Sequence, residues 1–184
     1  NSGKAYKIKR GMYTLYKDPL LISTFAKKPS YISGVSALSF HRAITQMPKE
    51  VFCSTNKASS KLKFIENIRY TKTNYFFGYN LENYEDFKIP IADKEKAIID
   101  SIGIVPIHII EEAFEEIDED RMIEYLLKIK NKKIIKRIGF LMERSGFNVY
   151  NKLKRSINYK PILLDPIGNK KGNDKSKKWR LIIN

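Results

Sequence analysis

The spacing of apolar residues along the chain predicts two different kinds of structure. Up to about residue 92, short runs rich in β-branched and aromatic residues are separated by Asn, Lys, Ser or Gly, a pattern typical of antiparallel strands. The expected strands cover residues 6–15 (one or two strands), 51–55, 62–68, 75–79 and 87–91. Two helices are expected among them, one over 20–25 and one that begins at Ser33 or Ser36 and ends near Thr45.

Helical spacing takes over at Asp93, a good N-cap for a helix that ends at Gly103. Further helices are expected over 107–117, 122–129, 132–144 and about 148–155. The tail then predicts a strand at 162–164, a Gly/Asn/Lys loop over 168–178 and a final strand at 179–183. Together these patterns predict an α+β fold, with a mostly antiparallel sheet packed with a C-terminal helical bundle and the terminal strand returning to the sheet.

Positive charge is concentrated in the two flanks of the chain. The formal net charge is +15, to which residues 1–80 contribute +11, residues 81–149 contribute −4 and residues 150–184 contribute +8. Such segregation indicates a one-sided positive field that attracts polyanions. The side chains expected to contact nucleic-acid phosphates are Lys7, Lys9, Arg10, Arg42, Lys57, Lys61, Lys63, Arg69, Lys170, Lys171, Lys175, Lys177 and Lys178.

We expect these basic residues to converge from both flanks into one surface. Lys61 and Lys63 alternate with Leu62 and Phe64, so on a strand the lysines face away from the core. The same lysines are equally consistent with protection of an exposed sheet edge. The flexible lysines of the tail suit phosphate contacts rather than base recognition.

The sequence offers no coherent catalytic or metal-binding constellation. His41 and His108 are far apart in sequence and lie outside any metal-ligand spacing, and Cys53 is expected to be buried in a strand. The glycine spacing in GNKKGNDKS (168–176) does not match a phosphate loop. The carboxylates at 111–120 are typical of a solvated helix face. We therefore expect a protein that is not an enzyme, with no catalytic residue, cofactor or metal.

The chain also lacks the signals of export. Its single cysteine excludes an internal disulfide, no apolar run is long enough to span a bilayer, and the start of the sequence has no signal-peptide core. These features predict a cytoplasmic protein that does not enter a membrane.

Six ordered blocks of the sequence resemble the AbiEi-type antitoxin family. The blocks are RGMYTL (10–15), DPL (18–20), SYISGVSALSFHRAITQMP (30–48), IADKEKAIID (91–100), LDP (164–166) and WRLIIN (179–184). Their joint order carries the resemblance, which covers nearly the whole chain. Proteins of this family are antitoxins and transcriptional autorepressors of type IV toxin–antitoxin and abortive-infection operons.

The resemblance implies how the chain is organised and what it contacts. The family places a winged-helix DNA-binding domain before the present domain, and no recognition helix is visible here. We expect residues 1–15 to form either the last wing strand of such a domain or the first strand of the next, and residues 16–184 to form the antitoxin-like C-terminal α+β domain. The implied partners are the DNA phosphate backbone and a nucleotidyltransferase-like toxin, which the antitoxin opposes without a stable complex.

Two other functions remain open on the sequence alone. The acidic segment 107–129 predicts a protein-interaction module that docks a basic partner or a second copy of the chain. The basic flanks are also compatible with an enzyme that acts on nucleic acid.

Overall fold

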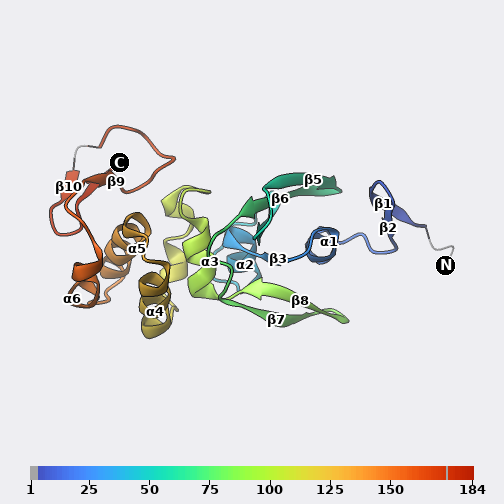
Figure 1. Ribbon diagram of the computed structural model, residues 1–184, viewed down its shortest axis with the longest axis horizontal. Coiled ribbons are helices and arrows are strands. Elements are labelled where there is room, and N and C mark those ends of the chain that lie inside the picture. Colours follow the sequence, from blue (N-terminus) through green and yellow to red (C-terminus); the bar gives the residue numbers. More distant parts are fainter. Residues whose placement is uncertain (1–3, 173) are drawn as a thin grey trace.

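The protein is built around a six-stranded mixed sheet. The computed structural model describes residues 4–172 and 174–184 and has an α+β fold (Figure 1). The strands of this sheet are β3 (Ser30–Ile32), β4 (Glu50–Thr55), β5 (Ser60–Phe64), β6 (Glu66–Lys72), β7 (Tyr79–Tyr84) and β8 (Phe87–Ala92). They lie in the order β5-β6-β4-β3-β8-β7, in which β6/β4 and β3/β8 are parallel and the other neighbours are antiparallel.

Two small sheets lie outside the main one. β1 (Tyr6–Lys9) and β2 (Met12–Thr14) form an antiparallel hairpin, which confirms the strands expected in this region. Near the C-terminus, β11 (Leu181–Ile183) lies between β9 (Ile162–Leu163) and β10 (Asp174–Ser176). The prediction that the terminal strand returns to the main sheet is therefore wrong. Trp179, which is buried against α5 (Lys132–Arg144), holds the tail on the far side of the helices.

Local capping chemistry explains where most helices begin. The helices are α1 (Pro19–Ala26), α2 (Gly34–Phe40), α3 (Lys94–Ser101), α4 (Glu119–Ile129), α5 and α6 (Tyr150–Leu153). The side chains of Asp18, Asp93, Asp118 and Asn131 accept hydrogen bonds from amides in the first turns of α1, α3, α4 and α5. Helix α2 ends at Phe40 rather than near Thr45, and Arg42 just beyond it adopts a positive φ of 56°.

The helix expected over 107–117 is wrong. This segment forms two 3₁₀ turns, η1 (Ile107–Ile109) and η2 (Glu112–Phe114). Ile107, Ile110 and Ala113 are buried at a spacing of three residues, which is the repeat of a 3₁₀ turn. The described part of the chain after α3 therefore holds α4, α5 and the short α6, which is extended by the 3₁₀ turn η3 (Lys154–Ser156), where four helices were expected.

The strand predictions fail where the chain turns. The strand expected over 62–68 is two strands, because Ile65 adopts a positive φ of 60° and reverses the chain between β5 and β6. The segment 75–79 is a loop up to Gly78, since Phe76 packs against Tyr31 with ring centroids 5.2 Å apart instead of joining a ladder. Strand β3 was not expected, because three residues are too few to show a period.

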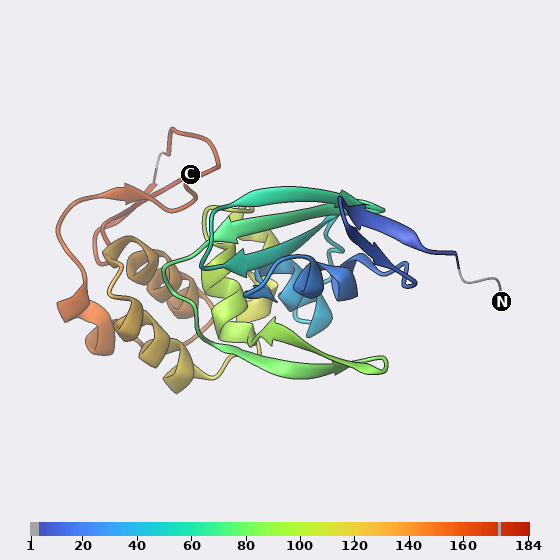
Figure 2. The same ribbon diagram turned by 45° about the vertical axis from the view of Figure 1, so that its right-hand side comes forward.

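The main sheet curves around two helices. In Figures 1 and 2, α1 and α2 lie between an arm formed by β5 and β6 and an arm formed by β7 and β8. Val51, Cys53, Ile68 and Tyr70 face α1, and the Tyr70 hydroxyl donates to the Ser23 carbonyl oxygen at 2.7 Å. We call the opposite side of the sheet the outer face.

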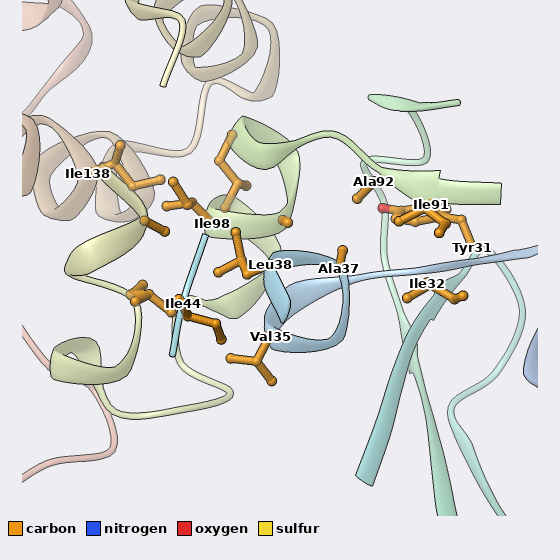
Figure 3. Close-up of a cluster of buried hydrophobic side chains, with 14 of the residues drawn as sticks. Tyr31, Ile32, Val35, Ala37, Leu38, Ile44, Ile91, Ala92, Ile98 and Ile138 are labelled. Atoms are coloured by element: carbon orange, nitrogen blue, oxygen red, sulfur yellow. The ribbon is translucent and has the colours of Figure 1, made fainter. Parts of the chain in front are cut away.

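A second part of the core joins the sheet to the helices. Figure 3 shows Leu38 of α2, Ile98 of α3 and Ile138 of α5 gathered on one side of β3. All three side chains are fully buried. The apolar stripes of α2, α3 and α5 are thus covered by one another rather than by the sheet alone.

The turn at Ile65 yields a stability prediction. Ile65 is 58% exposed and holds a left-handed conformation that costs an L-residue about 1–2 kcal/mol. We expect Ile65→Asn to raise the free energy of unfolding by about 0.5–1 kcal/mol, because Asn tolerates this conformation better. Urea denaturation measures the change, and Ile65→Val, which keeps the β-branch, is the control. Equal stability of the two variants would contradict the explanation.

Candidate nucleic-acid interface

Seven lysines gather around β5 and form what we call the N-terminal basic group. Its members are Lys7, Lys9, Lys27, Lys57, Lys61, Lys63 and Lys72. Lys9 Nζ donates to the Ala26 carbonyl oxygen at 2.7 Å, and Lys27 Nζ donates to Ser60 Oγ at 2.8 Å. These bonds join the β1–β2 hairpin, the end of α1 and the start of β5.

The charges within this group are close enough to act on one another. Burial, followed by the charges of Lys57 and Lys9, lowers the pKa of Lys27. Within residues 4–172 and 174–184, none of the seven lysines forms an ion pair with a carboxylate. The group is therefore a concentration of positive charge that no carboxylate of the described residues contacts as an ion pair.

The register of the sheet shows which basic side chains share the outer face. Lys61 is paired with Arg69, and Lys63 with Asn67, across β5 and β6. Arg69 is in turn paired with Phe52 of β4, so all three basic side chains point to the outer face. Lys72 lies at the end of β6, where its backbone N–H donates to Ser59 Oγ at 2.9 Å.

Two other basic residues that were expected to contact phosphates, Arg69 and Arg42, have carboxylates beside them. Arg69 forms an ion pair with Glu50 (2.7 Å), which reduces the charge it offers to a ligand. Arg42, just beyond α2, lines a hollow with Glu112, Glu115 and Glu116. Arg10 occupies the exposed turn of the β1–β2 hairpin and stays at the same end of the molecule as the N-terminal basic group.

The lysines of the tail lie at the opposite end. The β1–β2 hairpin is at one end of the long axis and the sheet of β9, β10 and β11 is at the other, in both views (Figures 1 and 2). This places Lys170, Lys171, Lys175, Lys177 and Lys178 far from the N-terminal basic group, and Lys178 forms an ion pair with Glu143 (2.6 Å). The expected convergence into one surface is wrong, because the hairpin packs on α1 and the tail packs on α5.

The acidic segment is occupied by contacts within the chain. Glu111 forms an ion pair with Arg144 (2.9 Å), Glu116 with Lys94 (2.8 Å) and Glu119 with Lys152 (2.8 Å). Glu112 Oε1 accepts from the backbone N–H of Thr45 at 2.8 Å. These carboxylates connect the 107–120 segment to α3, α5 and α6, and they do not form one uncompensated acidic surface.

A buried polar cluster was missed by the sequence interpretation. Lys96 of α3 is fully buried and forms an ion pair with Asp100, one helical turn further on. Lys96 Nζ also donates to the Tyr31 hydroxyl (2.7 Å), and that hydroxyl donates to Asp100 Oδ2 (2.9 Å). Ser54 completes the cluster with a longer contact of 3.4 Å to the same carboxylate oxygen. The signal was a Lys and an Asp at i, i+4 on a helix that is apolar between them.

The surroundings of this cluster are closely packed. Tyr79 stacks on Tyr31 with ring centroids 4.7 Å apart, and the Lys96 ammonium lies 5.6 Å from the Phe77 ring centroid. Gly78 has φ of +71°, and a Cβ there would lie 2.9 Å from Lys96 Cβ. Burial raises the pKa of Asp100, while Lys96 and the hydrogen bonds from Tyr31 and Ser54 oppose that rise.

One side of the cluster opens into a cavity on the outer face, which we call the Asp100 cavity. Its volume is about 170 Å³. The side chains of Asp100, Ser54 and Thr71 line its polar part, and Ile102 and Ile134 line its apolar part. Lys72 of the N-terminal basic group lies at this cavity, so the missed cluster and the predicted basic surface adjoin.

Cys53 and His41 were considered as candidate catalytic side chains, and both lie in packed or hydrogen-bonded positions. Cys53 is buried, which confirms the prediction, and burial raises the pKa of its thiol to about 12. His41 lies 2.8 Å from the Ala92 carbonyl oxygen through Nε2. Neither arrangement provides an activated nucleophile.

Over the parts of the chain that the structure describes, every helix is too short or too polar to cross a bilayer. No protein-family model matches the chain, and no curated protein matches it.

Proposed function

We propose that this chain is a nucleic-acid-binding domain of an AbiEi-like antitoxin and transcriptional autoregulator, and that the N-terminal basic group contacts DNA phosphates. The observation that carries the proposal is the clustering of Lys9, Lys27 and Lys57, which form no ion pair with a carboxylate within residues 4–172 and 174–184. The charges of Lys57 and Lys9 help to lower the pKa of Lys27, and an approaching phosphate would relieve that repulsion and so favour binding.

The exposed lysines around β5 are suited to contacts with the phosphate backbone of DNA. Lys57, Lys61 and Lys63 are exposed on the β4–β5 connection and on β5, and none is fixed by an ion pair among the described residues. Flexible ammonium groups follow a phosphate backbone without reading its sequence. Operator specificity would then come from a winged-helix segment of the kind that the family carries.

The antitoxin part of the proposal rests on the order of the six sequence blocks. Two of these blocks coincide with structural features that local chemistry explains: 18–20 begins α1 at the Asp18 cap, and 91–100 holds the Asp93 cap with Lys96 and Asp100. As a cytoplasmic autoregulator, the protein would oppose a nucleotidyltransferase-like toxin without forming a stable complex. Co-expression with the toxin of its own operon tests this: rescue of growth supports it, and unrelieved toxicity contradicts it.

Phosphate binding makes a quantitative prediction. We expect the affinity for duplex DNA to fall with salt with a slope of about −0.9 per phosphate neutralised. The variant Lys57→Ala/Lys61→Ala/Lys63→Ala should lose up to three such contacts, so its slope should be shallower by roughly 2–3. Fluorescence anisotropy over a salt series measures both slopes.

A matched variant at the helical end separates local contacts from net charge. Lys132→Ala/Lys133→Ala/Lys154→Ala removes the same charge from exposed positions on α5 and η3. It should leave the slope nearly unchanged. Equal effects of the two triple variants, or no binding of the unmodified protein at low salt, would overturn the proposed interface.

A further inference from the structure

The Asp100 cavity adjoins the surface proposed for phosphates. Thr71 and Lys72 are consecutive on β6, and both lie at the cavity. The backbone N–H of Lys72 donates a hydrogen bond to Ser59 Oγ, and Ser59 lies between Lys57 and Lys61 in the sequence. Thr71 is paired with Ser54 across β6 and β4, so both hydroxyls point to the outer face. Lys61 faces the same side and is the diagonal neighbour of Thr71, because it is paired with Arg69 across β5 and β6, so a strand that crosses Lys61 passes the mouth of the cavity.

The polar part of the cavity lining includes Asp100, Ser54 and Thr71. The carboxylate of Asp100 is held on one side by Lys96 and Tyr31, while the Ser54 hydroxyl reaches it only at 3.4 Å. A buried ion pair is weak evidence for stability alone, since apolar residues of similar size would serve the core as well. Lys96 balances the charge of Asp100, so the site favours a neutral group that donates a hydrogen bond over an ammonium ion.

The walls of the cavity suit a flat ring. Phe52 and Tyr75 contribute aromatic surface, and Ile102 and Ile134 contribute apolar surface. Its volume of about 170 Å³ corresponds to roughly six water molecules at ~30 Å³ each. That space is large enough for a single-ring base.

We propose that the Asp100 cavity receives one unstacked cytosine of a single-stranded nucleic acid whose backbone crosses the N-terminal basic group. The exocyclic amino group of cytosine donates to the Asp100 carboxylate, a pairing that proteins use to recognise this base. Thymine presents a carbonyl oxygen at the same position, so two acceptors would face each other and no hydrogen bond to Asp100 would form. The inference rests on the proposed function, because the phosphate contacts bring the strand to the cavity.

The experiment compares oligodeoxycytidine and oligothymidine of equal length in fluorescence anisotropy at neutral pH. The expected result is a preference of roughly tenfold for oligodeoxycytidine, which is the effect of one well-placed hydrogen bond to a base. Ile134→Trp, a substitution on a half-buried position that fills the cavity, should abolish the preference. Leu127→Trp on α4, which is 41% exposed and outside the cavity, should retain it.

A second variant tests the carboxylate itself. Asp100→Asn presents both a donor and an acceptor, so it should reduce the preference at least several-fold, and circular dichroism establishes that the variant is folded. Equal affinity for the two oligonucleotides, together with a normal salt slope, would overturn the inference and leave the phosphate contacts standing. Absence of binding to either oligonucleotide and to duplex DNA would overturn both. A preference that Ile134→Trp leaves unchanged would place base recognition elsewhere and also overturn the inference.

Discussion

Trp179→Ala is expected to lower the free energy of unfolding by about 3–5 kcal/mol, the cost of truncating a large buried aromatic residue. Trp179 is 1% exposed, its Nε1 donates to Glu143 Oε2 at 2.7 Å, and the Tyr150 ring meets its edge with centroids 5.2 Å apart. The side chain joins the C-terminal sheet to α5 and α6, so its loss also frees the tail. Urea denaturation followed by circular dichroism measures the effect.

Gly139 provides the control for this contact. A Cβ at this position of α5 would lie 2.2 Å from Cη2 of Trp179. Gly→Ala in a helix interior normally stabilises by about 1 kcal/mol, but here the clash should make Gly139→Ala destabilising by about 1–3 kcal/mol. In the Trp179→Ala background, the same substitution should become stabilising. A Gly139→Ala effect of the same sign in both backgrounds would contradict the proposed packing of Trp179 on α5.

The second large effect concerns the buried ion pair. Lys96→Met alone should cost about 3–5 kcal/mol, because it leaves the Asp100 carboxylate buried without its cation. The double variant Lys96→Met/Asp100→Leu should be more stable than Lys96→Met, since apolar side chains of similar size need no partner. Urea denaturation of the two single variants and the double variant gives the coupling free energy.

The pair Arg144–Glu111 serves as the comparison. Both side chains are partly exposed, so removing either should cost no more than about 1 kcal/mol. If the losses of unfolding free energy caused by substituting Lys96 and Asp100 were additive, or as small as those caused by substituting Arg144 and Glu111, the cluster would not be a coupled buried unit.

Elements with strong local signals were predictable from the sequence. Helix α3 begins at the expected Asp93 cap, α1 and α4 cover the segments 20–25 and 122–129 that were expected to be helical, and β4 and β8 are where β-branched and aromatic residues are dense. The prediction of an α-helix over 107–117 was wrong because a spacing of three residues between apolar side chains fits both an irregular helical stripe and a pair of 3₁₀ turns. Contacts with Asp165 and Thr45, distant in sequence, accompany the second arrangement.

The candidate sites also contain residues that the sequence pattern predicts and residues that only tertiary packing brings together. The lysines of β5 could be assigned to the outer face from their alternation with Leu62 and Phe64. Lys27 is not among the residues expected from the sequence, because only the packing of α1 against β5 brings it beside Ser60. The sequence pattern does not single out Lys96, because its burial depends on Tyr31, Tyr79 and Gly78 from the sheet and the loop that precedes β7.

The sequence by itself determined the α+β class, the capped helix starts and the segregation of charge, because each depends on neighbours only a few residues apart. Tertiary structure alone decided that the two basic flanks lie at opposite ends and that the last strand forms a separate sheet. It also decided that Asp100 and Ser54 meet beside a cavity, because these outcomes depend on which distant apolar faces bury one another.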